Sequence, residues 1–112
     1  CMHVVEHIGL GRYGDPIDPE GDVKACRELS RVLAPGGRLL FVVPIGGTAL
    51  IEFNAHRIYT HGLVESLFPV LRLTEFSYIP EQGPEGIREN ADPNALATEH
   101  YACGLFVFTK PV

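Results

Sequence analysis

The sequence predicts an α/β fold with a mixed sheet, and three observations support this prediction. An amphipathic helix is expected between Asp18 and Leu33, and an uninterrupted apolar run follows from Arg38 to Ile45. Two further runs typical of strands lie in the last third of the chain. A helix, a tight turn and a strand buried on both faces form the second half of a β-α-β unit, so part of the sheet is expected to be parallel. The last two strands are expected to form an antiparallel pair.

The helix is expected to begin near Pro19, because Asp18 supplies a capping carboxylate and proline suits the first turn. It is expected to end at Pro35 and Gly36, since proline cannot continue the hydrogen-bond ladder and glycine tolerates a left-handed cap. Apolar residues at steps of three and four mark one helical face, namely Val23, Cys26, Leu29, Val32 and Leu33.

The elements after the helix follow from composition and periodicity. The apolar run at residues 38–45 predicts a strand buried on both faces, and residues 46–57 predict a loop at its carboxyl end. A short helix is expected from Ile58 to Leu67. Alternating apolar and polar residues predict a strand from Val70 to Ile79, with a bulge near Thr74. An exposed loop is expected at residues 80–97 and a final strand at residues 99–109.

Composition excludes several classes of protein. Acidic residues outnumber Lys and Arg by 14 to 9, and the net charge of −5 argues against a nucleic-acid binder. No apolar run approaches the roughly 20 residues that cross a bilayer, so no membrane association is expected and a cytoplasmic location is predicted. Three cysteines without paired spacing indicate reduced thiols. Residues 1–112 are interpreted as one domain, and the apolar start of the chain suggests the C-terminal part of a larger one.

The first candidate site is the stretch His3-x-x-Glu6-His7. His3 is a candidate catalytic residue, because an imidazole titrates near neutrality and can act as a general base toward an acceptor hydroxyl. A simple wall residue is the alternative. The stretch also fits the H-x-x-E-H pattern of inverted zincins. Because Gly9 and Gly11 interrupt the expected helix and no third ligand is evident, we expect no metal here.

A second group of candidates lies on two loops that are expected at the same edge of the sheet. Their convergence would form a polar, anion-friendly pocket in which arginines hold a carboxylate or phosphate of a small-molecule substrate. The letters G-x-G-x-x-G at residues 9–14 are not interpreted as a dinucleotide site, because two prolines separate them from the helix. The candidate substrate-binding residues are Arg12, Tyr13, Asn54, His56 and Arg57.

Two segments give the chain a resemblance to a known family. Residues 3–8 (HVVEHI) look like the stretch after the fourth strand of class I S-adenosylmethionine-dependent methyltransferases, and residues 31–40 (RVLAPGGRLL) look like the turn into their fifth strand. Residues 9–16 and 53–57 are similar to an uncharacterised methyltransferase-like subfamily. The resemblance implies a partial Rossmann-like methyltransferase fold, with Met2 and His3 facing the cofactor S-adenosylmethionine. The glycine-rich cofactor loop of the family has no counterpart here, so weak or absent cofactor binding is expected.

Two functional hypotheses follow. The first is a fragment of a methyltransferase that acts on a small-molecule or sugar-type acceptor. The second is a non-catalytic α/β association module, with a zinc-binding protein as a further alternative through His3, Glu6 and His7. The strand at residues 38–45 is expected to expose an unpaired edge, which predicts a homodimer or larger homo-oligomer.

Overall fold

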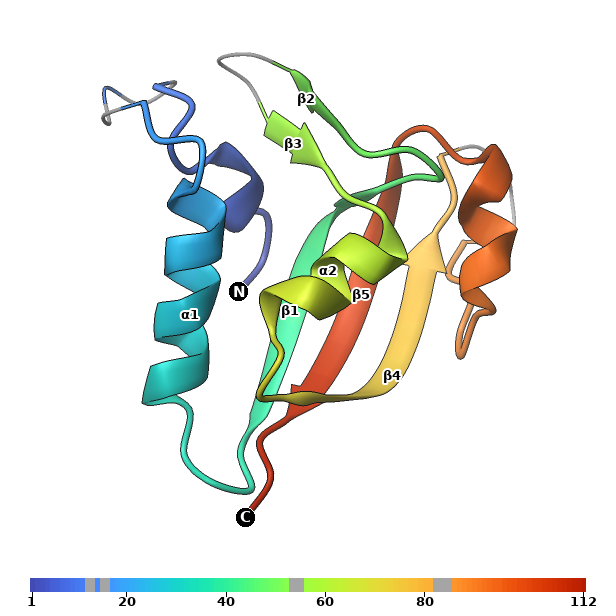
Figure 1. The fold of residues 1–112 in the computed structure, drawn as a ribbon. Helices are drawn as coiled ribbons and strands as arrows, with labels where there is room; N and C mark the ends of the chain where they lie inside the picture. The colour runs from blue at the N-terminus through green and yellow to red at the C-terminus, as the bar shows by residue number, and fades with distance from the viewer. Residues whose placement is uncertain (12–13, 15–16, 53–55, 82–85) are drawn as a thin grey trace.

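A computed structural model shows an α/β fold in which helices cover one face of a three-stranded sheet (Figure 1). It describes residues 1–11, 14, 17–52, 56–81 and 86–112. The elements in chain order are η1 (Val5–His7), α1 (Gly21–Val32), β1 (Arg38–Ile45), β2 (Leu50–Glu52), β3 (His56–Ile58), α2 (His61–Leu67), β4 (Arg72–Ile79), η2 (Pro93–Thr98) and β5 (Ala102–Thr109).

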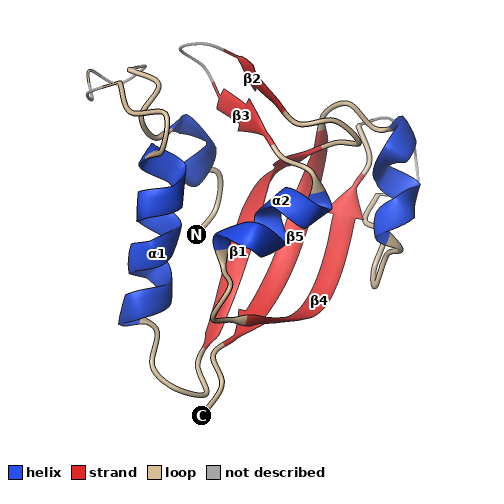
Figure 2. Ribbon diagram, viewed as in Figure 1, coloured by secondary structure: helices blue, strands red, loops and turns tan. Residues whose placement is uncertain are grey.

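The main sheet has the order β1-β5-β4, and both pairings are antiparallel. The expected antiparallel pair of the last two strands is therefore confirmed, and so is the predicted bulge, which lies between Leu73 and Glu75. The strands β2 and β3 form a separate antiparallel ribbon (Figure 2). Among the described residues, parallel pairing is limited to single bridges, Met2 with Val42 and Ile45 with Tyr59. The sheets are thus antiparallel rather than mixed.

The strand β1 spans the predicted residues, and its alternate side chains explain where the core lies. Phe41, Val43 and Ile45 are fully buried, whereas Leu40 is 60% exposed. Aromatic rings of β1, α2 and β5 pack together, with ring centroids 4.9 Å apart for Phe41 and Phe68. Such edge-to-face contacts add to the apolar burial that drives folding. The core therefore lies between the sheet and α2.

Helix α1 begins two residues later than expected. Asp18 does not cap the helix directly, because its carboxylate accepts a hydrogen bond from the amide of Glu20, 3.0 Å away, and the N-cap residue is Glu20. The apolar face is confirmed in part: Cys26 is fully buried, but Val23 and Val32 are exposed. One helix face is thus only partly covered by the sheet.

The middle of the chain contains strands where a loop and a helix were expected. The expected helix at 58–67 starts only at His61, because His56–Ile58 pair with β2, and Thr60 then caps α2 by accepting a hydrogen bond from Leu63. In the expected loop at 80–97, the 3-10 helix η2 was also missed. Three-residue strands and single turns of helix are too short to leave a clear periodicity.

The outer edge of β1 is only partly open. The amide of Val42 donates to the carbonyl of Cys1, and the amide of His3 donates to the carbonyl of Val42, each over 2.9 Å. The prediction of a fully unpaired edge was therefore wrong at this point. His3 has a φ of 52°, so the chain turns away after one bridge and does not form a longer parallel strand.

Among the described residues, no helix is long and apolar enough to cross a membrane.

Candidate functional site

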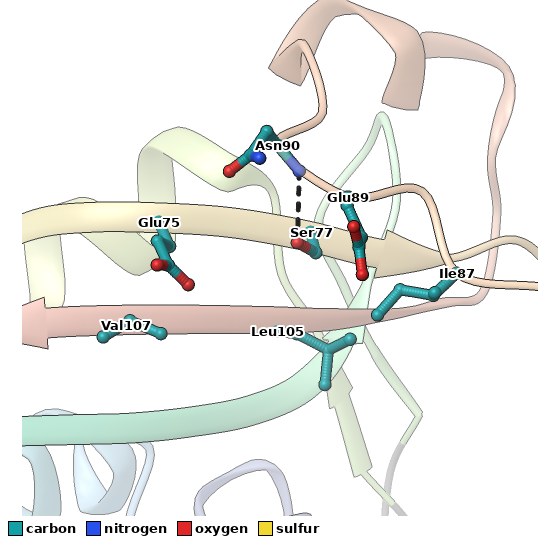
Figure 3. A pocket seen from close by; sticks show the side chains of 7 residues that line it. All are labelled: Glu75, Ser77, Ile87, Glu89, Asn90, Leu105 and Val107. Carbon is teal, nitrogen blue, oxygen red and sulfur yellow. Dashed lines mark hydrogen bonds between the residues drawn. The ribbon is translucent and has the colours of Figure 1, made fainter.

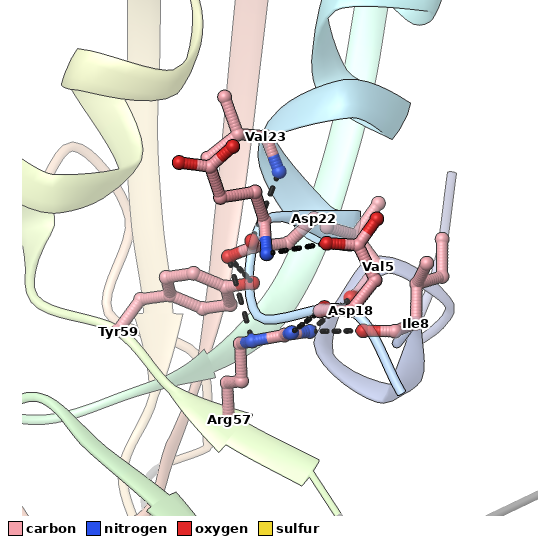
Figure 4. Close-up of polar contacts among 8 residues, drawn as sticks. Val5, Ile8, Asp18, Asp22, Val23, Arg57 and Tyr59 are labelled. Carbon is pink, nitrogen blue, oxygen red and sulfur yellow. Dashed lines mark hydrogen bonds and ion pairs between the residues drawn. The ribbon is translucent and has the colours of Figure 1, made fainter. Parts of the chain in front are cut away.

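Arg57 lies at the centre of a buried polar network (Figure 4). Its side chain comes from β3, and its guanidinium donates to the main-chain carbonyls of Val5, Ile8 and Asp18. Its Nε lies 3.7 Å from the Asp22 carboxylate, and no hydrogen-bond acceptor for Nε is found among the described residues. Arg57 is only 3% exposed. It therefore joins η1, the start of α1 and β3.

Tyr59 completes this network from the side of the sheet. Its hydroxyl donates to Asp22 Oδ2 over 2.9 Å, and both residues are buried. Burial raises the pKa of Tyr59 far above its ordinary value, and the Asp22 carboxylate adds to this shift. Arg57 and Tyr59 thus share one buried carboxylate.

A hollow of about 540 Å³ opens above this network, and we call it the Arg57 pocket. This volume lies in the range of small-molecule sites. Asp22, Arg57 and Tyr59 contribute polar groups, and apolar side chains from α1, β2, β3 and α2 form most of the remaining wall. These apolar residues are Val23, Leu50, Ile51, Ile58 and Leu63.

A larger hollow of about 630 Å³ lies between α1 and α2 and is also lined by Val70. Two of its cationic groups have partners: the Lys110 ammonium donates to the carbonyls of Ser30 and Leu33, and Arg31 pairs with Glu28. Lys110 in this way satisfies carbonyls at the end of α1, so helix capping explains its position in this hollow.

A second polar group lies where the N-terminal segment meets β5. His3 Nδ1 is 3.0 Å from Glu6 Oε2, and His3 Nε2 is 3.7 Å from Cys103 Sγ. Glu6 is 1% exposed, whereas the His3 side chain is 47% exposed. Met2 is exposed and makes the bridge to Val42. The catalytic role of His3 and the cofactor role of Met2 and His3 stay predictions.

The remaining predicted residues differ in what the structure shows. His56 packs its ring edge-on against Tyr101, with centroids 5.1 Å apart, and lies 6.3 Å from the ring of His7. Its substrate-binding role and that of Arg57 stay predictions. Arg12, Tyr13 and Asn54 lie outside the described residues.

The H-x-x-E-H stretch does not adopt the helical geometry of an inverted zincin. Its residues lie on a left-handed turn and the short 3-10 helix η1, and both His3 and His7 approach the same Glu6 oxygen, at 3.0 and 3.9 Å. Within the described part of the chain, no group of three His, Cys, Asp or Glu is placed to hold a metal ion. The zinc alternative therefore gains no support from this arrangement.

The face of the main sheet opposite α2 has hollows of its own. One, of about 410 Å³, is lined by Glu75, Ser77, Leu105 and Val107 together with residues 87, 89 and 90 (Figure 3). Another, of about 470 Å³, is lined by Arg38, Leu40, Glu75 and Val107. We call this surface the open face and define it by Arg38, Leu40, Glu75, Ser77, Leu105 and Val107.

Sequence reasoning missed three residues of these sites: Asp22, Tyr59 and Cys103. Asp22 lies within the helix expected between Asp18 and Leu33, and Tyr59 within the short helix expected from Ile58 to Leu67, and neither was predicted as a site residue. Cys103 lies 100 residues from its contact His3, so no local spacing indicates that contact. Only the pairing of β1 with β5 and of β1 with the N-terminal segment brings the two together.

The buried Tyr59 hydroxyl should make the free energy of unfolding depend on pH in the alkaline range. Because the folded-state pKa lies above the unfolded value near 10.0, the unfolded state loses its proton first, and stability falls as the pH rises above about 10. Tyr59→Phe should remove this contribution, so wild type should lose about 1.4 kcal/mol more per pH unit than the variant in urea unfolding. Equal alkaline slopes would contradict the buried contact.

At neutral pH the same variant should lower the free energy of unfolding by about 2 kcal/mol, because a hydrogen bond to a buried carboxylate is lost. Tyr101→Phe is the matched control. Its ring is 45% exposed, and this substitution should leave the free energy of unfolding nearly unchanged.

Comparison with known proteins corrects the family assignment. Residues 1–80 match a family described as Caenorhabditis protein of unknown function, DUF268. Nothing in this match indicates a class I S-adenosylmethionine-dependent methyltransferase, so that assignment was wrong, and the partial Rossmann-like methyltransferase fold that it implied is not supported. The S-adenosylmethionine cofactor depended on that resemblance and remains untested. Searches among curated proteins and among solved structures found no match. Because the match covers more than half of its 112 residues, the chain belongs to the DUF268 family.

Proposed function

We propose that this chain binds a small organic molecule in the Arg57 pocket. The observation that supports this most directly is the buried Arg57 Nε, which lacks a hydrogen-bond acceptor in the described part of the chain. Buried donors are nearly always satisfied, and Arg57 is one of the residues that line an apolar hollow, so its unsatisfied Nε favours a ligand that supplies the acceptor.

The surrounding charges restrict the chemistry of that ligand. Asp22 lies 3.7 Å from Arg57 Nε and offsets the guanidinium charge, and the Tyr59 hydroxyl is already used on Asp22. The Arg57 nitrogen that has no acceptor among the described residues is therefore Nε, in a residue that lines the hollow together with Ile51, Ile58 and Leu63. We infer a ligand with an apolar body and an oxygen acceptor at one end. This proposal keeps the predicted substrate-binding role of Arg57.

The oxidation state of the cysteines indicates the cellular compartment in which this binding would occur. Cys1, Cys26 and Cys103 are all free thiols. Free thiols fit a reducing compartment, and the cytoplasm is the location that we propose.

A calorimetric titration with 1-anilinonaphthalene-8-sulfonate, which joins apolar rings to anionic oxygens, tests the pocket. Wild type should bind one equivalent. Leu63→Trp should weaken binding by about tenfold or more, because the indole fills a hollow that Leu63 lines at 41% exposure.

Val70→Trp is the matched control, since Val70 is 61% exposed and lines the other hollow. Binding should survive this change. Loss of binding in Val70→Trp but not in Leu63→Trp would contradict the proposal, and so would binding that neither variant changes. Circular dichroism of each variant shows that the fold is kept.

A second function, self-association, is favoured by the open face. Leu40 is 60% exposed there, and Leu105 and Val107 are only half-buried, so apolar side chains of β1 and β5 meet solvent. Sheets bury such faces by packing on another sheet about 10 Å away. We propose that a second copy of this chain covers the open face and forms a homodimer.

The charges of the open face suit a two-fold partner. Arg38 begins β1, whereas Glu75 lies on β4, and both line one hollow. A two-fold axis across the strands brings Arg38 of each copy toward the acidic side of the other. Because the open face carries both a positive and a negative side chain, it favours a second copy over an unrelated partner whose surface carries charges of one sign.

Sedimentation equilibrium of wild type and Leu40→Glu tests this association. Wild type should be dimeric at high concentration, and Leu40→Glu should weaken the dimer by about tenfold or more, because it places a carboxylate in the apolar contact. Val70→Glu, at a position with 61% exposure outside the open face, should remain dimeric. A wild-type monomer at the highest soluble concentration would disprove the second proposal.

A further inference from the structure

Cys103, His3 and Glu6 form a chain of contacts outside the Arg57 pocket. The thiol lies 3.7 Å from one imidazole nitrogen of His3, and the other nitrogen lies 3.0 Å from the Glu6 carboxylate. This is the order of groups found where a nucleophile, a base and an orienting carboxylate act together.

The fold places these three groups together by main-chain contacts. The amide of His3 donates to the carbonyl of Val42 in β1, and Pro44 of the same strand pairs with Cys103 in β5. His3 adopts the left-handed backbone that non-glycine residues rarely adopt. Unusual backbone of this kind is concentrated at functional sites, where the surrounding structure holds it in place.

Glu6 gives an independent indication of function. Its carboxylate is 1% exposed, and within the described residues Oε1 has no hydrogen-bond partner. Oε2 faces two imidazoles, at 3.0 Å for His3 and 3.9 Å for His7. A buried carboxylate held in this way fixes the orientation of the adjacent imidazole.

We propose that Cys103 is a nucleophile that accepts acyl groups from activated esters, with His3 as its general base and Glu6 as the positioning residue. The thiol is protonated at rest, because burial and the Glu6 carboxylate both raise the pKa of Cys103. A base must therefore remove the proton during the reaction. His3 lies between the thiol and Glu6, so one of its nitrogens faces the thiol proton while the other contacts the carboxylate.

The reaction is balanced by groups that the chain and the ester supply. As Cys103 Sγ bonds to the carbonyl carbon, the thiol proton moves to His3 Nε2, while Glu6 holds the proton on Nδ1. The bond from carbon to the leaving oxygen then breaks, and the proton passes from Nε2 to that oxygen. The products are a thioester on Cys103 and an alcohol. Water later releases the acid and restores the thiol.

The two cysteines differ in exposure, so the reaction is possible at Cys103 and blocked by burial at Cys26. Cys103 is half-buried and contacts a His3 side chain that is 47% exposed, so a small ester can reach it from solvent. Cys26 is fully buried, and burial raises its pKa to about 12. Cys26 therefore reacts only if the protein unfolds, which makes it an internal control.

The test uses 4-nitrophenyl acetate on the full chain carrying Cys1→Ser, at neutral pH. Mass spectrometry should find the acetyl group on Cys103, and release of 4-nitrophenol should give its rate. His3→Asn should slow acetylation by about tenfold or more, because asparagine tolerates the left-handed backbone but supplies no base. His100→Asn, at an exposed histidine three residues before Cys103, should react like the parent.

Glu6→Leu separates positioning from structural support. Glu6→Leu leaves no buried charge at His3, because the His3 side chain is 47% exposed to solvent, so the variant should remain folded with Cys26 unreactive. Acetylation should nonetheless fall by about tenfold or more, and nitrogen NMR of His3 should show loss of the preference for a proton on Nδ1.

Acetylation of Cys103 at equal rates in the parent and His3→Asn would overturn the proposal, and so would the absence of an acetyl group on Cys103. Either result would leave small-molecule binding in the Arg57 pocket untouched, because that test concerns different residues.

Discussion

The buried guanidinium of Arg57 is the interaction on which both candidate sites depend. It binds carbonyls at the two ends of η1 and at Asp18, which are separated from Arg57 by 39 to 52 residues in sequence. By fixing η1 it fixes Glu6, and by approaching Asp22 it fixes the carboxylate that Tyr59 also contacts. A planar, permanently charged group with five donors suits this role, and lysine does not replace it.

This arrangement links stability to recognition. Desolvating an arginine is costly, and the cost is offset here by three carbonyls and one carboxylate. One nitrogen, Nε, is left without an acceptor in the described part of the chain, and Arg57 also lines the apolar hollow. The same residue thus holds three segments together, and the ligand-binding proposal rests on it as well. Within η1, the buried Glu6 likewise contacts a partly exposed residue, because its carboxylate lies 3.0 Å from the His3 imidazole.

Long periodic segments were predictable, whereas the sites depended on contacts distant in sequence. The apolar run at 38–45 predicts a buried strand, as observed. The final antiparallel pair follows from the length and alternation of the last two strands. The parallel neighbour was wrongly expected, because the left-handed turn at His3 ends the pairing after one bridge. Arg57 was among the predicted substrate-binding residues and that role stays a prediction, but its buried partners were not foreseeable from spacing. The contact between His3 and Cys103 likewise arises only from the register of β1 with β5.

The most direct test of this account is the free energy of unfolding of Arg57→Met. Removing the guanidinium leaves Asp22 buried without its cation, so the free energy of unfolding should fall by about 3–5 kcal/mol in urea. Arg31→Met is the matched control, because Arg31 pairs with Glu28 on the surface and its loss should change the free energy little. An Arg57→Met protein as stable as wild type would contradict the central role of this residue.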